Sequence, residues 1–182
     1  MNKTLEQFRE VVRRCRDLFL KKTADYGTAW RILRPASITD QLYIKALRIR
    51  SIEEKGEQKV ADSVESEFVG LVNYCVLALI QLELPHDAPL ELAPQQVAEH
   101  YDHHINENIR LLQDKNHDYG EAWRSMSQES FVDLILMKLQ RHEDPRIRSK
   151  VALLLVRAHR NADWLAQQLN NDDPRIRANA IE

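Results

Sequence analysis

The sequence has few of the residues that build turns, sheets or cross-links. Only four glycines, six prolines and two cysteines occur among its 182 residues, and no run of alternating β-branched residues predicts a strand. Cys15 and Cys75 form no C-x-x-C pair and lie at apolar helical positions, so we interpret them as buried, reduced thiols. Leu, Ala, Glu, Gln, Lys and Arg are abundant instead, which favours helix throughout.

Strong net charge and an export signal are also missing. The formal net charge of -2 gives no whole-chain electrostatic reason to bind nucleic acid or an anionic membrane. The opening MNKTLEQF leads directly into an amphipathic pattern without an apolar signal core, and we expect no apolar run long enough to span a bilayer. The sequence therefore predicts a cytoplasmic protein with no membrane partner, and its 43% hydrophobic residues suffice for a buried core.

The most informative feature that is present is an internal repeat. The motif K-x-x-DYG-x-AWR occurs at residues 22–31 and again at 115–124. A second motif, S-x-x-D-x(4)-K-x-x-R, follows at the same distance in both places, at 37–48 and at 130–141, so the two copies align without a gap. A match that includes tryptophan, the rarest residue type, is improbable by chance, so the repeat indicates a duplication.

Helical periodicity around the repeat predicts an all-α protein of seven or eight helices, with a duplicated helix-turn-helix bundle about a pseudo-twofold axis. Thr4 would cap the first helix and Gly27 would end it, Ser37 would cap the second, and the third would begin near Val60. Pro94 would start the helix of the second copy. We expect a first unit at 1–84, a proline-rich linker at 85–94, a second, partial unit at 95–141 and a helical tail at 142–182.

The tail lacks the repeat and has one of its own. EDPRIR at 143–148 is echoed by DDPRIR at 172–177, and each Asp-Pro pair would cap and start a helix. A period near 29 with paired helices resembles HEAT-type repeats, with the final unit incomplete. Such a tail could dock a protein partner or a second copy of the chain.

Asp25 and its counterpart Asp118 are unusual because each carboxylate faces the negative end of a helix dipole, at a cost of about 0.3–1 kcal/mol. A salt bridge from Asp25 to Arg31, Arg34 or Lys45 would offset this cost and build a structural corner. A metal ion or another ligand held by Asp25 would also offset it. Both interpretations are open at the level of sequence.

Aromatic and cationic residues around the first motif form a chemically sensible nucleotide site. Tyr26 or Trp30 could stack a base, although both could instead be core aromatics where two helices meet. No Gly-rich phosphate loop accompanies them. The candidate nucleotide-binding residues are Lys22, Tyr26, Trp30, Arg31, Arg34, Lys45 and Arg48, and those of the second copy are Lys115, Asp118, Tyr119, Trp123, Arg124, Lys138 and Arg141.

Mg²⁺ is the one cofactor that these residues indicate. It usually takes one or two protein carboxylates together with phosphates and water, and Asp25, Asp40 and Glu65 are the candidate ligands. Asp25 and Glu65 are also the candidate catalytic residues, since a metal-activated water would attack a phosphorus and release pyrophosphate if the chain is an enzyme. We interpret the neighbouring Glu67 as part of a solvated acidic turn.

A second set of potential ligands lies in the helix before the second motif. His100, His104 and Glu107 share one helical face, and His103 lies beside them, which is a metal-capable spacing. The first copy has no matching residues. We therefore interpret these side chains as a solvated polar face.

The two repeated motifs, together with Asn73-Tyr74, closely resemble a bacterial and phage family of nucleotide-modification-associated domains, whose Bacteroidetes members look duplicated in the same way. The resemblance covers 5–84 fully and 101–141 in part, and it implies a nucleotide-related context rather than a particular reaction. A more distant similarity to MazG-like all-α nucleotide pyrophosphohydrolases implies Mg²⁺ held by helix-borne acids around a triphosphate. The chain departs from that pattern, because the first helix has no E-x-x-E and Phe68 and Gly70 follow Glu65 and Glu67 at three residues.

Two functions follow as alternatives. The first is a nucleotide-binding domain, possessing pyrophosphohydrolase activity if the carboxylates hold Mg²⁺. The second is a non-catalytic interaction module in which the repeated motif is an ion-pair corner and the tail binds another protein. Convergence of the Asp25 and Glu65 carboxylates beside Lys45 at an open pocket would favour the first.

Overall fold

The computed structural model describes residues 3–56, 63–85 and 87–141, and the expected HEAT-like tail lies outside them. These residues form five α-helices and two short 3-10 helices, with no strand among them, which confirms the all-α prediction. The elements are α1 (Lys3–Tyr26), η1 (Ala29–Ile32), α2 (Pro35–Lys55), α3 (Val64–Glu83), α4 (Pro94–Tyr119), η2 (Ala122–Ser125) and α5 (Gln128–Arg141).

Two of the predicted helix ends are confirmed, at Gly27 and Pro94, whereas Thr4 is not the cap of α1, because the helix already includes Lys3. Gly27 has a positive φ of 58° and its N–H donates to the Thr23 carbonyl at 2.9 Å, so it ends α1 as predicted. Pro94 begins α4, also as predicted. The predicted cap at Ser37 is wrong, because α2 begins two residues earlier with Pro35 at its first turn. Ser63 caps α3, accepting from the Ser66 N–H at 3.1 Å, so this helix starts later than expected.

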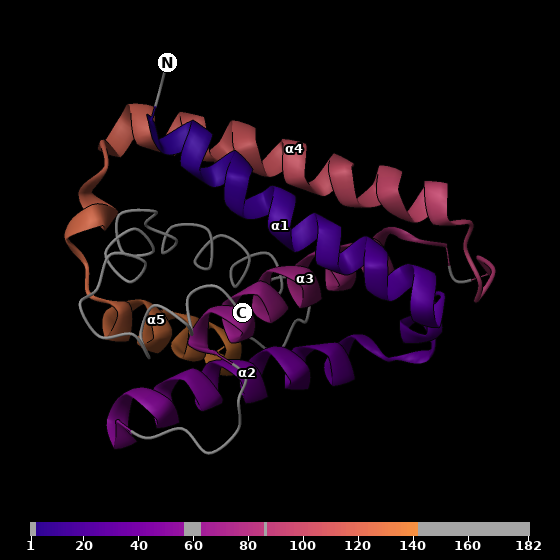
Figure 1. The fold of residues 1–182 in the computed structure, drawn as a ribbon, viewed down its shortest axis with the longest axis horizontal. Coiled ribbons are helices and arrows are strands. Elements are labelled where there is room, and N and C mark those ends of the chain that lie inside the picture. The colour runs from indigo at the N-terminus through magenta and orange to yellow at the C-terminus, as the bar shows by residue number, and fades with distance from the viewer. Residues whose placement is uncertain (1–2, 57–62, 86, 142–182) are drawn as a thin grey trace.

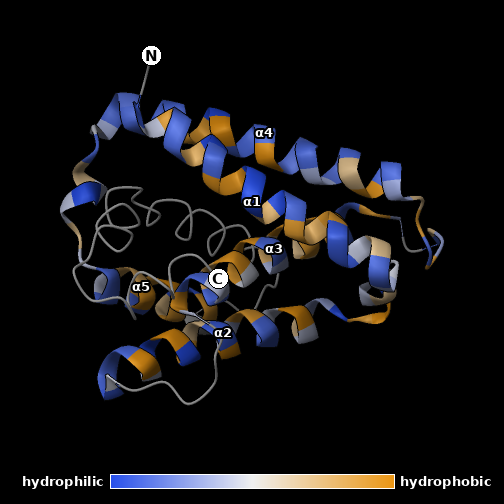
Figure 2. Cartoon of the chain, viewed as in Figure 1, coloured by the Kyte–Doolittle hydropathy of each residue, from blue (hydrophilic) through white to orange (hydrophobic). Residues whose placement is uncertain are grey.

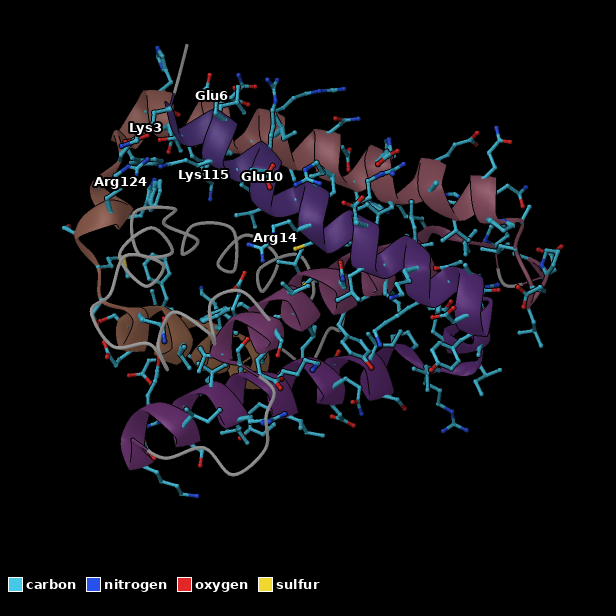
Figure 3. All side chains as sticks on the ribbon, in the orientation of Figure 1. Lys3, Glu6, Glu10, Arg14, Lys115 and Arg124 are labelled. Carbon is cyan, nitrogen blue, oxygen red and sulfur yellow. The ribbon has the colours of Figure 1, made fainter. Side chains whose placement is uncertain are left out.

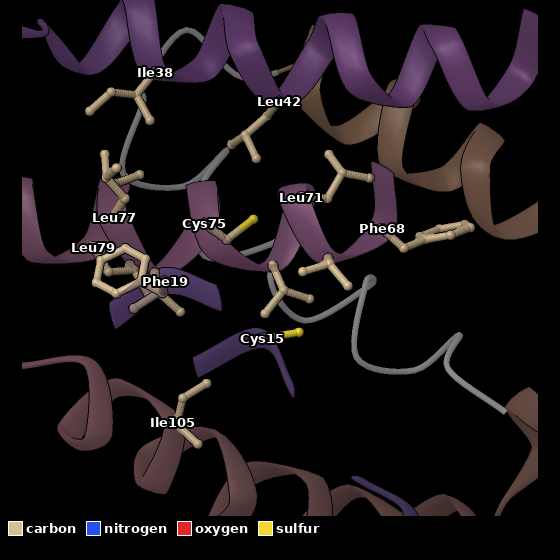
Figure 4. Close-up of a cluster of buried hydrophobic side chains, with 14 of the residues drawn as sticks. Cys15, Phe19, Ile38, Leu42, Phe68, Leu71, Cys75, Leu77, Leu79 and Ile105 are labelled. Atoms are coloured by element: carbon tan, nitrogen blue, oxygen red, sulfur yellow. The ribbon is translucent and has the colours of Figure 1, made fainter. Parts of the chain in front are cut away.

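Helix α3 forms the centre of the hydrophobic core. Its apolar side chains meet those of α2 on one side and those of α1 and α4 on the other, as the close-up in Figure 4 shows for Leu42, Cys75, Phe19 and Ile105. Both cysteines are buried and free, as expected. Figure 2 shows the contrast with α1 and α4, whose exposed faces are hydrophilic. An apolar helix enclosed in this way explains how a chain rich in charge keeps one continuous core.

The expectation about apolar runs needs a correction. Within the described residues α3 is long and apolar enough to cross a membrane by length and composition. Most of the helix is buried inside the protein, and the core helix of a soluble protein passes the same test. The apolar composition of α3 is thus explained by its contacts with α1, α2 and α4.

The two copies pack element against equivalent element. Helix α1 contacts α4, and α2 contacts α5. Figure 1 shows α1 and α4 running side by side in opposite directions, and Arg16 joins them through two hydrogen bonds to the Asp102 carboxylate, at 2.6 and 2.8 Å. Each helix thus meets its own counterpart, which is the pairing that a pseudo-twofold duplication predicts.

Candidate functional site

The repeated motif builds the same backbone corner twice. Gly27 and Gly120 have φ values of 58° and 63°, and each is followed by a 3-10 helix of four residues. The residues that precede these short helices, Thr28 and Glu121, have nearly identical dihedral angles, with φ of -102° and -103° and ψ of 38° in both. The motif therefore determines the same local backbone conformation in both copies, whether or not it also binds a ligand.

In the first copy this corner holds the linker that leads into α4. Arg31 is buried, and its Nη1 donates to Oε1 of Gln81 at 2.5 Å. Its Nη2 and Nε donate to the backbone carbonyls of Ala88 and Pro89, at 3.1 and 3.3 Å. Because these bonds engage the guanidinium within the protein, Arg31 holds the linker in this structure and is not among the residues that line the pocket described below, so its contact with a phosphate stays a prediction.

Thr28 and Gly27 complete this contact. The Thr28 hydroxyl donates to the Leu90 carbonyl at 2.7 Å and accepts from the Leu92 N–H at 3.0 Å. The Glu91 carboxylate lies so close to Gly27 that an added Cβ would stand 2.6 Å from its Oε1. Gly27 therefore supplies both the left-handed turn and the space for the linker.

The second corner makes the reciprocal contact, with the start of α1 in the first copy. Arg124 lies over the Trp123 ring at 4.6 Å and pairs with Glu121 at 2.6 Å. It also donates to Thr4 and Gln7 at the start of α1, and Figure 3 shows it beside that end of the helix. Each corner thus binds the chain at the start of the other copy's first helix, so the duplication interlocks the two units.

Replacing Arg31 with methionine is expected to lower the free energy of unfolding by about 2 kcal/mol, because Gln81 and the partly buried linker carbonyls lose the charged donor of a buried side chain. Arg124→Met is the matched control, since Arg124 is partly exposed and its loss should cost less than about 1 kcal/mol. Urea denaturation of the two variants measures the difference. Equal losses would mean that Arg31 and Arg124 contribute equally to the free energy of unfolding.

A pocket of about 560 Å³ opens between the end of α1, the first corner, α2 and α3. This volume lies within the range of small-molecule sites. Four candidate nucleotide-binding residues are among its lining, namely Lys22, Tyr26, Trp30 and Lys45. The aromatic side chains of Phe19 and Tyr74 and the amide of Asn73 also line it. The structure thus brings together residues that are 23 positions apart in the first copy.

A buried carboxylate fixes the cations at the base of this pocket. Glu67 is only 2% exposed, and it accepts from Lys45 Nζ at 3.0 Å and from Arg48 Nη1 at 2.5 Å. Gly70 makes room for the lysine, because an added Cβ would meet Lys45 Cε at 2.7 Å. Lys45 also lies 6.0 Å from the centre of the Tyr74 ring. The interpretation of Glu67 as a solvated acidic residue is therefore wrong.

Trp30 differs from its counterpart in one polar contact. Its Nε1 is buried without an acceptor in the described part of the chain, whereas Nε1 of Trp123 donates to Asn116 at 3.2 Å. The residue equivalent to Asn116 in the first copy is Thr23, whose hydroxyl donates to the Phe19 carbonyl at 3.0 Å. A buried donor without a partner costs about 1–3 kcal/mol. A ligand atom that accepts a hydrogen bond from Trp30 Nε1 would therefore be stabilising in the first copy.

Asn73 anchors the wall of the pocket to the core. Its Nδ2 donates to the Cys15 carbonyl at 3.0 Å, and its Oδ1 accepts from the Tyr101 hydroxyl at 2.9 Å. Burial raises the pKa of Tyr101 well above its usual range, which keeps this hydroxyl a donor. The network ties α1, α3 and α4 together, so the side of Asn73 that faces the pocket is held in place.

The candidate catalytic residues are not brought together. Asp25 is exposed at the end of α1 and makes no ion pair within residues 3–56, 63–85 and 87–141. Glu65 is buried and pairs with Arg14 at 2.9 Å. Arg14 precedes Asp25 by eleven residues, which is about 16 Å along a helix. Asp40 and Arg34 are exposed on the surface and do not line the pocket.

The second-copy candidates lie on the surface around the other corner. Tyr119 is 77% exposed, Lys115 is exposed, and Asp118 contacts only the adjacent His117, at 3.1 Å, among the ion pairs of described residues. Lys138 is half-buried on α5, and Arg141 is the last residue of that helix. Lys115, Asp118, Tyr119 and Lys138 do not line the pocket of the first copy.

The histidines of α4 require a second correction. His104 is buried rather than solvated, and its Nε2 lies 3.3 Å from Oε2 of Glu83, the last residue of α3. Glu83, His103, His104 and Glu107 offer ligand atoms that all lie within 4.8 Å of one another. This cluster could hold a metal ion. Sequence reasoning missed Glu83 because it comes from another helix.

Comparison with known proteins gives one match. The family model for "Nucleotide modification associated domain 1" matches residues 22–82 and 115–161, together more than half of the chain. No curated protein and no solved structure matches. The second matched segment continues twenty residues beyond Arg141, where the sequence repeat was expected to stop. The comparisons give no support to the resemblance of the tail to HEAT repeats or to the similarity with MazG-like enzymes.

Proposed function

We propose that this chain, which belongs to the nucleotide modification associated domain 1 family, binds a nucleotide in the pocket of its first copy. The observation that carries the proposal is the convergence of Lys22, Tyr26, Trp30 and Lys45 on a single pocket of about 560 Å³. These residues belong to the repeated motifs. The family description associates the domain with nucleotide modification, which makes a nucleotide the class of ligand to expect.

The lining of the pocket matches both halves of a nucleotide. Tyr26 and Trp30 offer ring faces on which a base can stack, a contact worth about 1–3 kcal/mol by alanine substitution. The charged lining residues are Lys22, Lys45 and Glu67, two cations and one anion, so the pocket carries a net charge of +1. Arg48, behind Glu67, adds a further positive charge. The excess of cations favours a phosphate group at the end where Lys45 lies.

The pairing of the carboxylates favours a site that binds a nucleotide and has no preformed hydrolytic centre. Glu67 is the one acidic residue that lines the pocket in the described part of the chain, and it is engaged by Lys45 and Arg48. Glu65 is engaged by Arg14. In this proposal Mg²⁺ arrives with the phosphates of the nucleotide, as it commonly does, and Asp25, which is exposed beside Tyr26 in the sequence, could contact one of its waters.

A panel of nucleotides tests the proposal. Isothermal titration of the full chain with nucleoside mono-, di- and triphosphates, with and without Mg²⁺, should give saturable binding of at least one nucleotide. A pyrophosphate-release assay on the same samples distinguishes a binding domain from a hydrolase, and Asp25→Asn tests the candidate catalytic carboxylate. Absence of binding to every nucleotide would favour the interaction module instead.

Gly70 offers a test that separates ligand binding from stability. Gly70→Ala is expected to displace the Lys45 ammonium, because the new Cβ would occupy its path, and to weaken nucleotide binding about tenfold. Stability should fall by much less than in a variant that loses Glu67, since Arg48 still pairs with Glu67 and the better helix propensity of alanine, about 1 kcal/mol, offsets part of the loss of the Lys45–Glu67 pair. Titration and thermal melting of the same sample measure both effects. Unchanged affinity would remove Lys45 from the site.

A further inference from the structure

The hairpin formed by α3 and α4 carries four metal-ligating side chains at one place. Glu83 ends α3, and His103, His104 and Glu107 lie on the third and fourth turns of α4. None of the four lines the nucleotide pocket. The cluster is therefore separate from the site proposed above, and it does not depend on the function of that site.

His104 is the residue that points to a ligand. Its side chain is 1% exposed, and its Nε2 has no hydrogen-bond partner within the described residues, although Glu83 Oε2 lies 3.3 Å away. Its Nδ1 lies 3.8 Å from Oε2 of Glu107. A buried polar atom of this kind normally has a partner, and a cation between the imidazole and the carboxylates would supply one.

The remaining three ligands can adjust around this fixed ring. Glu83, His103 and Glu107 are exposed, and His103 Nε2 already lies 3.8 Å from Glu107 Oε2. Ligands bound tetrahedrally at about 2.0–2.2 Å from a metal are about 3.4 Å apart. The present separations, all within 4.8 Å, need a contraction that exposed side chains can make by rotation.

We propose that Glu83, His103, His104 and Glu107 bind a divalent transition metal of the Zn²⁺ class, which joins the end of α3 to α4. Two imidazoles and two carboxylates suit Zn²⁺ and its first-row neighbours, whereas Mg²⁺ and Ca²⁺ prefer ligand sets made of oxygen. The linker of residues 84–93 connects the two helices, so a metal at this position closes the hairpin across it. The ion would be structural unless an exchangeable ligand remains.

Zn²⁺ binding to the full chain at pH 7.5, in competition with a chromophoric chelator, tests the proposal. The wild type should bind Zn²⁺ with a matching rise in melting temperature, and Co²⁺ should give the visible spectrum of a tetrahedral site. His103→Gln and Glu107→Gln change exposed residues that the fold does not need, and each should weaken binding by about tenfold or more. His104→Ala should abolish the Co²⁺ spectrum.

His100→Gln is the matched control, because His100 lies one turn before His104 on α4 and outside the cluster. Its affinity for Zn²⁺ should equal that of the wild type. The proposal is overturned if the wild type binds no Zn²⁺ at micromolar concentrations. It is also overturned if His103→Gln and Glu107→Gln bind as tightly as the wild type, or if His100→Gln loses as much affinity as they do.

Discussion

Replacement of Glu67 with leucine is expected to lower the free energy of unfolding by about 3 kcal/mol, the largest loss that we expect from a single change in this chain. Glu67 is 2% exposed and holds both Lys45 and Arg48. Removing one partner of a buried ion pair leaves the other charges partly desolvated, at about 3–5 kcal/mol. The lower end applies here because both cations retain some exposure to solvent.

A compensated variant distinguishes the structural role of the cluster from its role in binding. Lys45→Met, Arg48→Met and Glu67→Leu together remove all three charges, and such neutral replacements are often nearly as stable as the original cluster. We therefore expect urea denaturation to show recovery of most of the lost stability. Nucleotide binding should not recover, because the phosphate partner is gone. A triple variant as unstable as Glu67→Leu would show that packing, rather than charge, explains the loss.

Replacement of Tyr26 with alanine is expected to weaken nucleotide binding by about 5-fold to 150-fold, as the loss of one stacking surface of about 1–3 kcal/mol requires. Tyr26 is 72% exposed at the rim of the pocket, so its removal should leave the melting temperature unchanged. Adding Lys22→Gln should weaken binding further for nucleotides with more phosphates. Isothermal titration measures both effects.

The duplication provides a control with the same chemistry. Tyr119 and Lys115 occupy the equivalent positions of the second copy, and neither lines the pocket. Tyr119→Ala with Lys115→Gln should therefore bind nucleotide as the wild type does. Equal losses in the two double variants would place the nucleotide elsewhere, for example at a site shared by both corners.

The fold and half of the site could be predicted from the sequence because both depend on local patterns. Helical periodicity gave the all-α class, and the repeat of aromatic and cationic residues pointed to Lys22, Tyr26, Trp30 and Lys45. Pro35 was overlooked as a helix start, although proline is favoured in the first turn. These features need only the geometry of one helix or one turn.

The remainder depends on which face of α3 meets which neighbour. Glu67 and Gly70 are three residues apart, and Tyr74 is four further along, so helical phase places all three on the face toward Lys45. The sequence shows that these three residues share one face of a helix, but it does not show which helix that face contacts. Glu65, two residues before Glu67, faces Arg14 instead. A shift of two residues thus separates a pocket residue from one that pairs with α1.

The role of Arg31 was hidden for a similar reason. An arginine beside DYG and a tryptophan has the composition of a phosphate contact, and its acceptors in the linker are backbone carbonyls that no side-chain pattern reveals. Asp25, in contrast, remains exposed at the end of α1. Its unfavourable position in the helix dipole is thus offset by solvent in this structure, and its role beside a bound nucleotide stays a prediction.

Tryptophan fluorescence tests the central claim most directly, because Trp30 lies in the pocket and Trp123 occupies the equivalent corner without it. The chain has three tryptophans, so the pairs Trp123→Phe with Trp164→Phe and Trp30→Phe with Trp164→Phe give proteins in which one corner reports alone. Each variant is titrated with a nucleotide that the wild type binds. The emission of Trp30 should change saturably, with the affinity measured by calorimetry. The emission of Trp123 should stay constant. A response from Trp123 alone, or from neither tryptophan while calorimetry shows binding, would contradict the account.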